Sequence, residues 1–140
     1  MLNKPLPREA HLYNGLALAY IGDAVYEIYV RKHLLDQGGT KSHLLHKQAT
    51  NYVSAKAQAK ILNSLLSRGI LTEQELDMVK RGRNAKINTV PKHTDVHVYR
   101  LSTGFESLIG YLYLSRQIER MEELIALGFN TIEKEGEDHE

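Results

Sequence analysis

The chain of 140 residues contains no cysteine, which excludes both a disulfide scaffold and a metal site built on thiolates. It also lacks an uncharged apolar run of about eighteen residues, the length that a membrane-spanning helix needs, because Asp23 and Glu27 interrupt the longest apolar stretch. The N-terminal sequence MLNKPLPREAHLYNG has no apolar core of the kind that a signal peptide carries. These absences predict a cytoplasmic protein with no membrane partner.

Alternation of apolar and polar residues, the pattern of a half-buried strand, is also missing, and the chain has no internal repeat or low-complexity linker. Apolar residues instead recur at helical spacing. The hydrophobic share of 42% and the charged share of 25% are ordinary for a globular domain. Asn14 and Ser54 are predicted helix N-caps, and Thr72 with Glu75 forms a capping box. The sequence therefore predicts an all-α, single-domain helical bundle.

The expected helices follow these signals, with one long interruption before the fifth helix. We predict helices at residues 16–35, 42–52, 55–67, 72–80, 95–116 and 117–132. The segment 82–94 contains Pro91, several turn formers and no sustained apolar period, so we expect a loop there. We expect the domain to span residues 1–132 and the acidic segment 133–140 to be a disordered tail.

Positive charge is concentrated in one segment, although the net charge of the whole chain is only +1. Between Lys80 and Arg100, six lysines and arginines stand against the single acid Asp95. The segment 133–140, in contrast, carries five acids and one lysine. A local basic surface of this kind favours a polyanionic partner such as RNA, and the plain alternative is a solvated face.

Two apolar stretches each contain an acid close to a glycine. In the stretch 16–35 the acid is Asp23, directly after Gly22, and in the stretch 105–114 it is Glu106, one turn before Gly110. A carboxylate in a buried helix is costly unless it is paired, hydrogen-bonded or bound to a cation. Glycine in a helix interior is also unfavourable, and close approach of another backbone is the usual compensation. We therefore expect the two helices to cross at the glycines, which would bring two buried acids together around a divalent metal.

These same stretches resemble the two motifs of the ribonuclease III family. AYIGDAVYE resembles the family signature L-E-F-L-G-D-A/S-V-L, and TGFESLIGYLYL resembles its second motif, in the same order and at a similar spacing. The resemblance extends to about residue 132. The length of the chain and its RGRNAK segment (residues 81–86) are similar to the mini-ribonuclease III branch, which lacks the family's double-stranded-RNA-binding domain.

The resemblance implies a Mg²⁺-dependent endoribonuclease, with Mn²⁺ as a possible substitute for Mg²⁺. Asp23 and Glu106 match the family's catalytic, metal-binding acids, and the implied products carry 5′-phosphate and 3′-hydroxyl ends. The implied substrate is double-stranded or structured RNA, with a precursor of large-subunit ribosomal RNA as the cellular target. The family also works as a two-fold homodimer whose signature helices lie at the interface, so we expect the same assembly here.

The segment after the fourth predicted helix is the candidate RNA-binding site. Its residues Arg81, Arg83, Asn84 and Lys86 offer hydrogen bonds to phosphates and ribose hydroxyls, the groups that an A-form duplex presents in its shallow groove. In the resembling family this connection also faces RNA. Lys80 and Lys92 are weaker candidates, because either could simply be solvated.

The chain departs from the family motifs at three acidic positions. A Glu four residues before the motif Asp is replaced by Ala19, an Asp three residues before the motif Glu is replaced by Thr103, and a further acid in the intervening helix falls at Leu44. We therefore expect a metal site with fewer acids, similar to the pattern of the mini branch.

The same residues allow interpretations other than a metal-dependent endoribonuclease. Glu27 could be a third metal ligand, but its (i, i+4) spacing to Arg31 favours an ion pair. The histidines have no zinc-like spacing to a third ligand, and no HExxH motif occurs. The main rival function is a catalytically silent dimer of the same fold that only binds RNA, and a second rival is a helical interaction protein without an RNA partner. Retention of both Asp23 and Glu106 argues against a silent protein.

Overall fold

The computed structural model describes residues 1–87 and 89–138, and the ordered elements in these residues are all helices. A short 3₁₀ turn, η1, precedes six α-helices. The elements are η1 (Ala10–Leu12), α1 (Gly15–Asp36), α2 (Ser42–Val53), α3 (Ala55–Ser67), α4 (Glu73–Arg83), α5 (Val96–Leu114) and α6 (Ile118–Asp138). The all-α prediction is confirmed for this part of the chain, which contains no strand.

Local side-chain caps explain where several helices begin. The Oδ1 atom of Asn14 accepts a hydrogen bond of 2.9 Å from the Ala17 backbone N–H at the start of α1. Ser54 caps α3 in the same way. At the start of α4, the Thr72 side chain accepts from the Glu75 N–H and the Glu75 side chain accepts from the Thr72 N–H, at 3.1 and 2.9 Å. These caps satisfy backbone donors that have no partner inside the helix. Because each cap joins residues only three positions apart, it can be predicted from the sequence.

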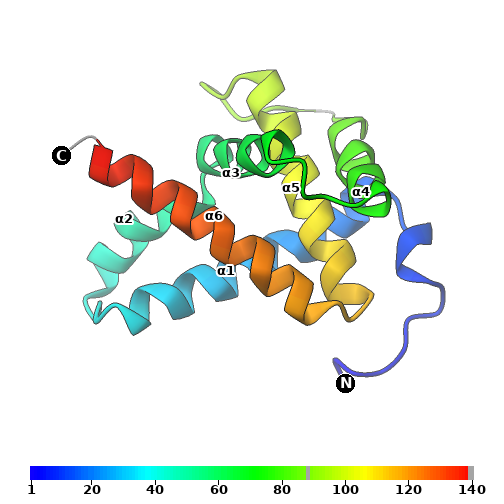
Figure 1. Ribbon diagram of the computed structural model, residues 1–140, viewed down its shortest axis with the longest axis horizontal. Helices are drawn as coiled ribbons and strands as arrows, with labels where there is room; N and C mark the ends of the chain where they lie inside the picture. Colours follow the sequence, from blue (N-terminus) through cyan, green and yellow to red (C-terminus); the bar gives the residue numbers. More distant parts are fainter. Residues whose placement is uncertain (88, 139–140) are drawn as a thin grey trace.

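Helix α5 is the central element, and α1, α3, α4 and α6 all pack against it. In Figure 1 it runs from the top of the view down through the middle of the molecule, between α3 and α4, and crosses α1. Almost every residue between Leu101 and Leu112 is buried, as expected for a helix that is covered on all sides. At its centre the Phe105 ring packs edge-on against Tyr26 of α1, with 5.1 Å between ring centroids. The Tyr26 hydroxyl donates to the Tyr52 carbonyl oxygen at 2.8 Å, so the buried phenol is satisfied.

Helices α1 and α5 cross with their backbones in direct contact at Gly22 and Gly110. A Cβ atom placed on Gly22 would overlap the carbonyl oxygen of Glu106 and lie 2.8 Å from the Gly110 nitrogen. A Cβ atom on Gly110 would likewise overlap the Leu18 carbonyl oxygen. The predicted crossing at these two glycines is therefore confirmed, and it requires that both positions lack a side chain.

The predicted disordered tail is wrong for residues 133–138, because α6 continues through Asp138. Glu133 explains part of this extension. Its Oε2 atom accepts hydrogen bonds of 3.1 Å from both the Tyr52 hydroxyl and the Gln37 amide, and it lies 3.0 Å from the His33 ring nitrogen. The acidic segment thus contacts α1 and α2, whereas residues 139–140 lie outside the described residues. Two smaller boundaries also differ, since α4 runs on to Arg83 and α5 ends at Leu114.

No helix in the described part of the chain is both long enough and apolar enough to span a membrane.

Candidate active site

A cleft between α1 and α5 contains both acids that the sequence singles out. Asp23 comes from α1 one residue after the crossing glycine, and Glu106 comes from α5 one turn before Gly110. The cleft is lined by Leu16, Ala19, Tyr20, Ile21, Asp23, Ala24, Tyr99, Thr103 and Glu106. The backbone contact at the crossing therefore sets the relative position of the two carboxylates.

Glu106 is partly buried and lies against the Asp23 carboxylate. Burial, together with a hydrogen bond and charge repulsion from Asp23, raises the pKa of Glu106 to about 9. The Gln58 amide opposes this shift because it favours the ionised form. At neutral pH the pair therefore holds either a proton or a cation, since two adjacent carboxylates repel each other.

The expectation that Asp23 is buried is wrong, because Asp23 is exposed to solvent. Its neighbours Gly22, Val25 and Tyr26 are buried instead. Asp23 therefore lies on the open side of the cleft, beside the more shielded Glu106. An exposed carboxylate next to a shielded one leaves the pair accessible to a substrate arriving from solvent.

Two of the three positions where the family motifs carry further acids line this same cleft. They are occupied by Ala19 and Thr103, and the Thr103 hydroxyl donates to the Tyr99 carbonyl oxygen at 3.0 Å. Leu44, the third position, is exposed on α2 and is not part of the cleft. The cleft therefore has two carboxylates in place of a larger acidic cluster.

The donor set of the cleft fits a hard divalent cation. Carboxylate oxygens are the ligands that Mg²⁺ prefers, and Mg²⁺ requires only one or two of them because it keeps several water molecules. A cation between Asp23 and Glu106 would also replace the proton that otherwise neutralises the pair. In the described residues no group of three histidine or acidic side chains is arranged to hold a metal. Glu27 instead pairs with Arg31 at 3.0 Å, as its spacing predicts.

The four candidate RNA-binding residues lie at the end of α4 and the start of the following loop, where they differ in exposure. Asn84 and Lys86 are exposed, whereas Arg81 and Arg83 are partly buried. The Arg81 guanidinium donates to the carbonyl oxygens of His11 and Tyr13. Arg81 therefore ties the end of α4 to the segment before α1, an anchoring role that its charge alone does not reveal.

This segment lies beside the acidic cleft. Arg81, Asn84 and Lys86 line a shallow pocket together with the start of α1, and Leu16 belongs to both this pocket and the cleft. The pocket lined by the predicted RNA-binding residues thus adjoins the cleft that holds the two acids, although 60 residues lie between Asp23 and Asn84 in the chain.

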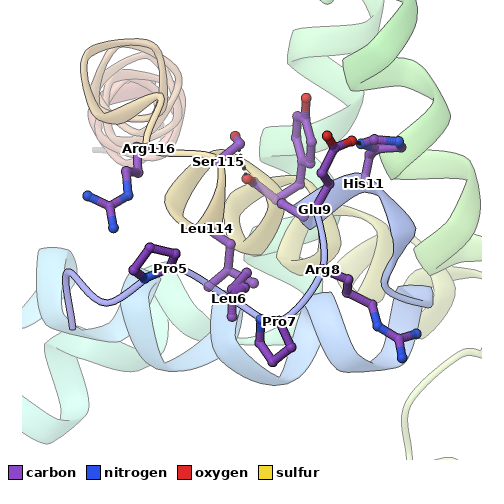
Figure 2. A pocket seen from close by; sticks show the side chains of 11 residues that line it. Pro5, Leu6, Pro7, Arg8, Glu9, His11, Leu114, Ser115 and Arg116 are labelled. Atoms are coloured by element: carbon purple, nitrogen blue, oxygen red, sulfur yellow. Dashed lines mark hydrogen bonds and ion pairs between the residues drawn. The ribbon is translucent and has the colours of Figure 1, made fainter. Parts of the chain in front are cut away.

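A different hollow lies between the N-terminal segment and the turn that joins α5 to α6 (Figure 2). Arg8, His11 and Arg116 contribute to its lining, and its single carboxylate, Glu9, is 3.4 Å from the His11 ring nitrogen. It contains neither of the paired acids. Its composition does not suit a metal-dependent reaction, so the cleft between α1 and α5 is the better candidate for an active site.

One buried polar residue near the acids was not predicted from the sequence. Gln58 of α3 is 2% exposed and lies next to Glu106. A signal for it exists, because residue 58 shares helical spacing with the buried Ile61, Leu62 and Leu65. An amide on the apolar face of a helix indicates a specific polar partner in the core.

The comparisons with known proteins agree with the fold and the cleft. Residues 16–117 match the Ribonuclease III domain model, and this match covers most of the chain. A crystal structure of a protein from Fusobacterium nucleatum has the same fold, with a TM-score of 0.75, 33% sequence identity, and coverage of 83% of this chain and 93% of that one. The chain belongs to the ribonuclease III family, and it is an endoribonuclease that acts on double-stranded RNA.

Within that family, the similarity is to the small members named Mini-ribonuclease 3. The chain is 58% identical to Mini-ribonuclease 3 of Enterococcus faecalis over 118 residues, which is 84% of this chain and 89% of the relative. It is 46% identical to Mini-ribonuclease 3 of Staphylococcus aureus over 114 residues, 81% of this chain and 85% of that one.

Proposed function

We propose that Asp23 and Glu106 are the catalytic residues of this endoribonuclease and that together they hold Mg²⁺ in the cleft between α1 and α5. The observation that supports this proposal is their juxtaposition, an exposed carboxylate against a shielded one whose pKa is raised. When bound, the cation supplies charge neutralisation at a phosphate and lowers the pKa of water, and Mn²⁺ has the same ligand preferences.

The protein itself holds the two carboxylates in a fixed relative position. The backbone contact at Gly22 and Gly110 fixes the two carboxylates relative to each other, so neither depends on a flexible loop. Apolar residues of α1, such as Leu16 and Ile21, line the same cleft. A phosphodiester entering from the exposed Asp23 side would meet both acids at once.

We propose that the end of α4 and the loop after it bind the RNA backbone beside the cleft. Asn84 and Lys86 are exposed next to the cleft, so they would contact phosphate and ribose, with Arg83 at the edge of the same surface. Arg81 would support this surface by holding the end of α4 in place through its bonds to the carbonyl oxygens of His11 and Tyr13. Such contacts recognise the shape of an A-form duplex with little dependence on base sequence.

We propose that the protein works as a two-fold homodimer formed through α1. The outward face of this helix carries exposed apolar residues at helical spacing, with Leu16 47%, Tyr20 86% and Ile28 67% exposed. A surface of this kind marks a contact site, and a two-fold contact presents two clefts to the two strands of a duplex. Its cellular substrate would be a precursor of large-subunit ribosomal RNA in the cytoplasm, cut to 5′-phosphate and 3′-hydroxyl ends.

The catalytic assignment is tested with Asp23→Asn and Glu106→Gln. Each change keeps the side-chain shape and removes a charged ligand, so we expect RNA cleavage to be lost while RNA binding stays within about tenfold of wild type. Cleavage of a long RNA duplex at saturating Mg²⁺ and binding of the same duplex in Ca²⁺ are the two measurements. Substantial residual cleavage in either variant would contradict the assignment.

The dimer is tested with Ile28→Asp, which places a charge in the exposed apolar face of α1 without disturbing the core. Sedimentation should show wild type as a dimer at micromolar concentration and Ile28→Asp as a monomer of about 16 kDa. Val96→Asp is the matched control, since Val96 is also exposed but belongs to α5 and not to α1. A monomeric wild-type protein that still cleaves RNA would rule out the dimer.

A further inference from the structure

Gln58 is the one polar side chain of α3 that turns fully into the core beside the catalytic acids. It is 2% exposed, and it occupies the apolar face of the helix with Ile61 and Leu62. The start of α3 is fixed by the Ser54 cap, and the helix packs directly against α5. The amide therefore has a defined position beside the Glu106 carboxylate.

The nitrogen of this amide has hydrogen-bond partners, whereas its oxygen has none among the described residues. Its Nε2 atom donates to the Val53 carbonyl oxygen at 3.1 Å, and the amide lies against the Glu106 carboxylate. Its Oε1 atom is buried and has no hydrogen-bond partner among the described residues. A buried acceptor without a partner is unfavourable, and such atoms in folded proteins call for a physical reason.

We propose that Gln58 is a positioning residue of the metal site: its N–H group orients the Glu106 carboxylate, and its free Oε1 atom offers an oxygen to the hydration shell of the bound cation. This inference rests on the proposed function of Asp23 and Glu106. A hydrated Mg²⁺ keeps several water molecules, each of them a hydrogen-bond donor. A neutral oxygen beside the site accepts from this shell without adding charge, which suits a cleft where Ala19 and Thr103 stand in place of acids.

A second buried oxygen without a hydrogen-bond partner among the described residues, that of Ser107, provides a comparison for Gln58. The Ser107 hydroxyl is also buried and has no partner in the described part of the chain, but its Cβ packs against Gly82 of α4. Ser107 differs from Gln58 because it makes no hydrogen bond to the Glu106 carboxylate that affects the pKa of that group. Ser107→Ala is therefore a matched control for the loss of a buried, unpaired oxygen.

The test measures cation affinity without relying on cleavage. The affinity for Mn²⁺ is measured by electron paramagnetic resonance, and the Mg²⁺ dependence of the melting temperature is measured for wild type, Gln58→Met, Gln58→Glu, Ser107→Ala and Asp23→Asn. Outer ligands of metal sites typically contribute about 10–100-fold in affinity, so Gln58→Met should bind about tenfold more weakly. Ser107→Ala should bind like wild type. For cleavage, Gln58→Met should need more Mg²⁺ for half-maximal rate and recover most of the rate at saturation.

Gln58→Glu separates a role in cation binding from a merely structural one. It keeps the oxygen and adds a charge, so it should be less stable than wild type in chelator and gain more from Mg²⁺. Gln58→Glu also provides the test of the proposal if Gln58→Met fails to fold. Wild-type Mn²⁺ affinity in Gln58→Met, or an Mg²⁺ response of Gln58→Glu no greater than that of wild type, would overturn the role of Gln58. If Asp23→Asn also keeps wild-type cation affinity, the proposed metal site itself is wrong.

Discussion

The crossing of α1 and α5 makes a specific prediction for Gly22→Ala. The added methyl group would overlap the Glu106 carbonyl oxygen and lie 2.8 Å from the Gly110 nitrogen. Both atoms belong to the main chain of α5, so no side-chain rotation can make room. The helices would have to separate by about 1 Å to restore ordinary contact distances.

Two opposing effects determine how much Gly22→Ala changes the free energy of unfolding. Overpacking a core is unfavourable by about 1–3 kcal/mol, and a clash between backbones belongs at the upper end of that range. Replacing glycine by alanine inside a helix is favourable by about 0.5–1 kcal/mol. The clash should win, and the free energy of unfolding should fall by about 2 kcal/mol, which corresponds to a melting temperature lower by about 8 °C.

Urea unfolding followed by circular dichroism, at one protein concentration for all variants, measures this difference. Gly136→Ala is the matched control, because Gly136 also lies in a helix but a Cβ atom there would meet nothing within 4 Å. That variant should be as stable as wild type or slightly more stable. If Gly22→Ala behaved like Gly136→Ala, the helices would not be in backbone contact at this point. The separation of α1 from α5 should also weaken Mg²⁺ binding in Gly22→Ala.

Two further predictions concern charged side chains in the folded protein. The folded state holds a proton on Glu106 up to about pH 9, whereas the unfolded chain loses it near the ordinary pKa of 4.5. In chelator, stability should therefore fall as pH rises from 5 to 9, by up to about 1.4 kcal/mol per pH unit, and thermal melts of Glu106→Gln should lack this slope. Burial alone would raise the pKa of Glu75, but the Arg120 guanidinium and the Thr72 N–H lower it, with Arg120 Nη2 2.9 Å from Glu75 Oε1. Arg120→Ala leaves this 3% exposed carboxylate unpaired and should reduce stability by about 3–5 kcal/mol at pH 7, whereas the double variant Arg120→Leu, Glu75→Gln should recover most of the loss. Equal stability of Arg120→Ala and wild type would mean that Glu75 is solvated.

Features determined by short stretches of sequence were predictable. The N-caps at Asn14 and Ser54 and the capping box at Thr72 depend on neighbours within three residues, so they could be read directly. The crossing at Gly22 and Gly110 was also predictable, since glycine inside an apolar helix needs a compensating contact.

Features that depend on distant parts of the chain were not predictable in the same way. The contacts by which Arg81 anchors the end of α4 are one example, because the carbonyl oxygens that it contacts come from residues about seventy positions earlier. The exposure of Asp23 depends on which face of α1 the other helices cover. The acidic composition of residues 133–138 indicated disorder, yet Glu133 finds donors on Tyr52 and Gln37, and Glu135 pairs with Lys60 at 3.0 Å.

The contact between α1 and α5 has a mechanical consequence for the two acids that we propose to be catalytic. When one of two crossing helices rotates slightly about the crossing, its ends move most and the residues at the crossing move least. The 22 residues of α1 span about 33 Å, so a tilt of roughly 5° would shift the far end of the helix by more than 1 Å. Asp23, one residue from the pivot at Gly22, would move by only a few tenths of an ångström. The two carboxylates therefore occupy the place in the molecule where thermal bending of α1, or its adjustment to bound RNA, disturbs their separation least.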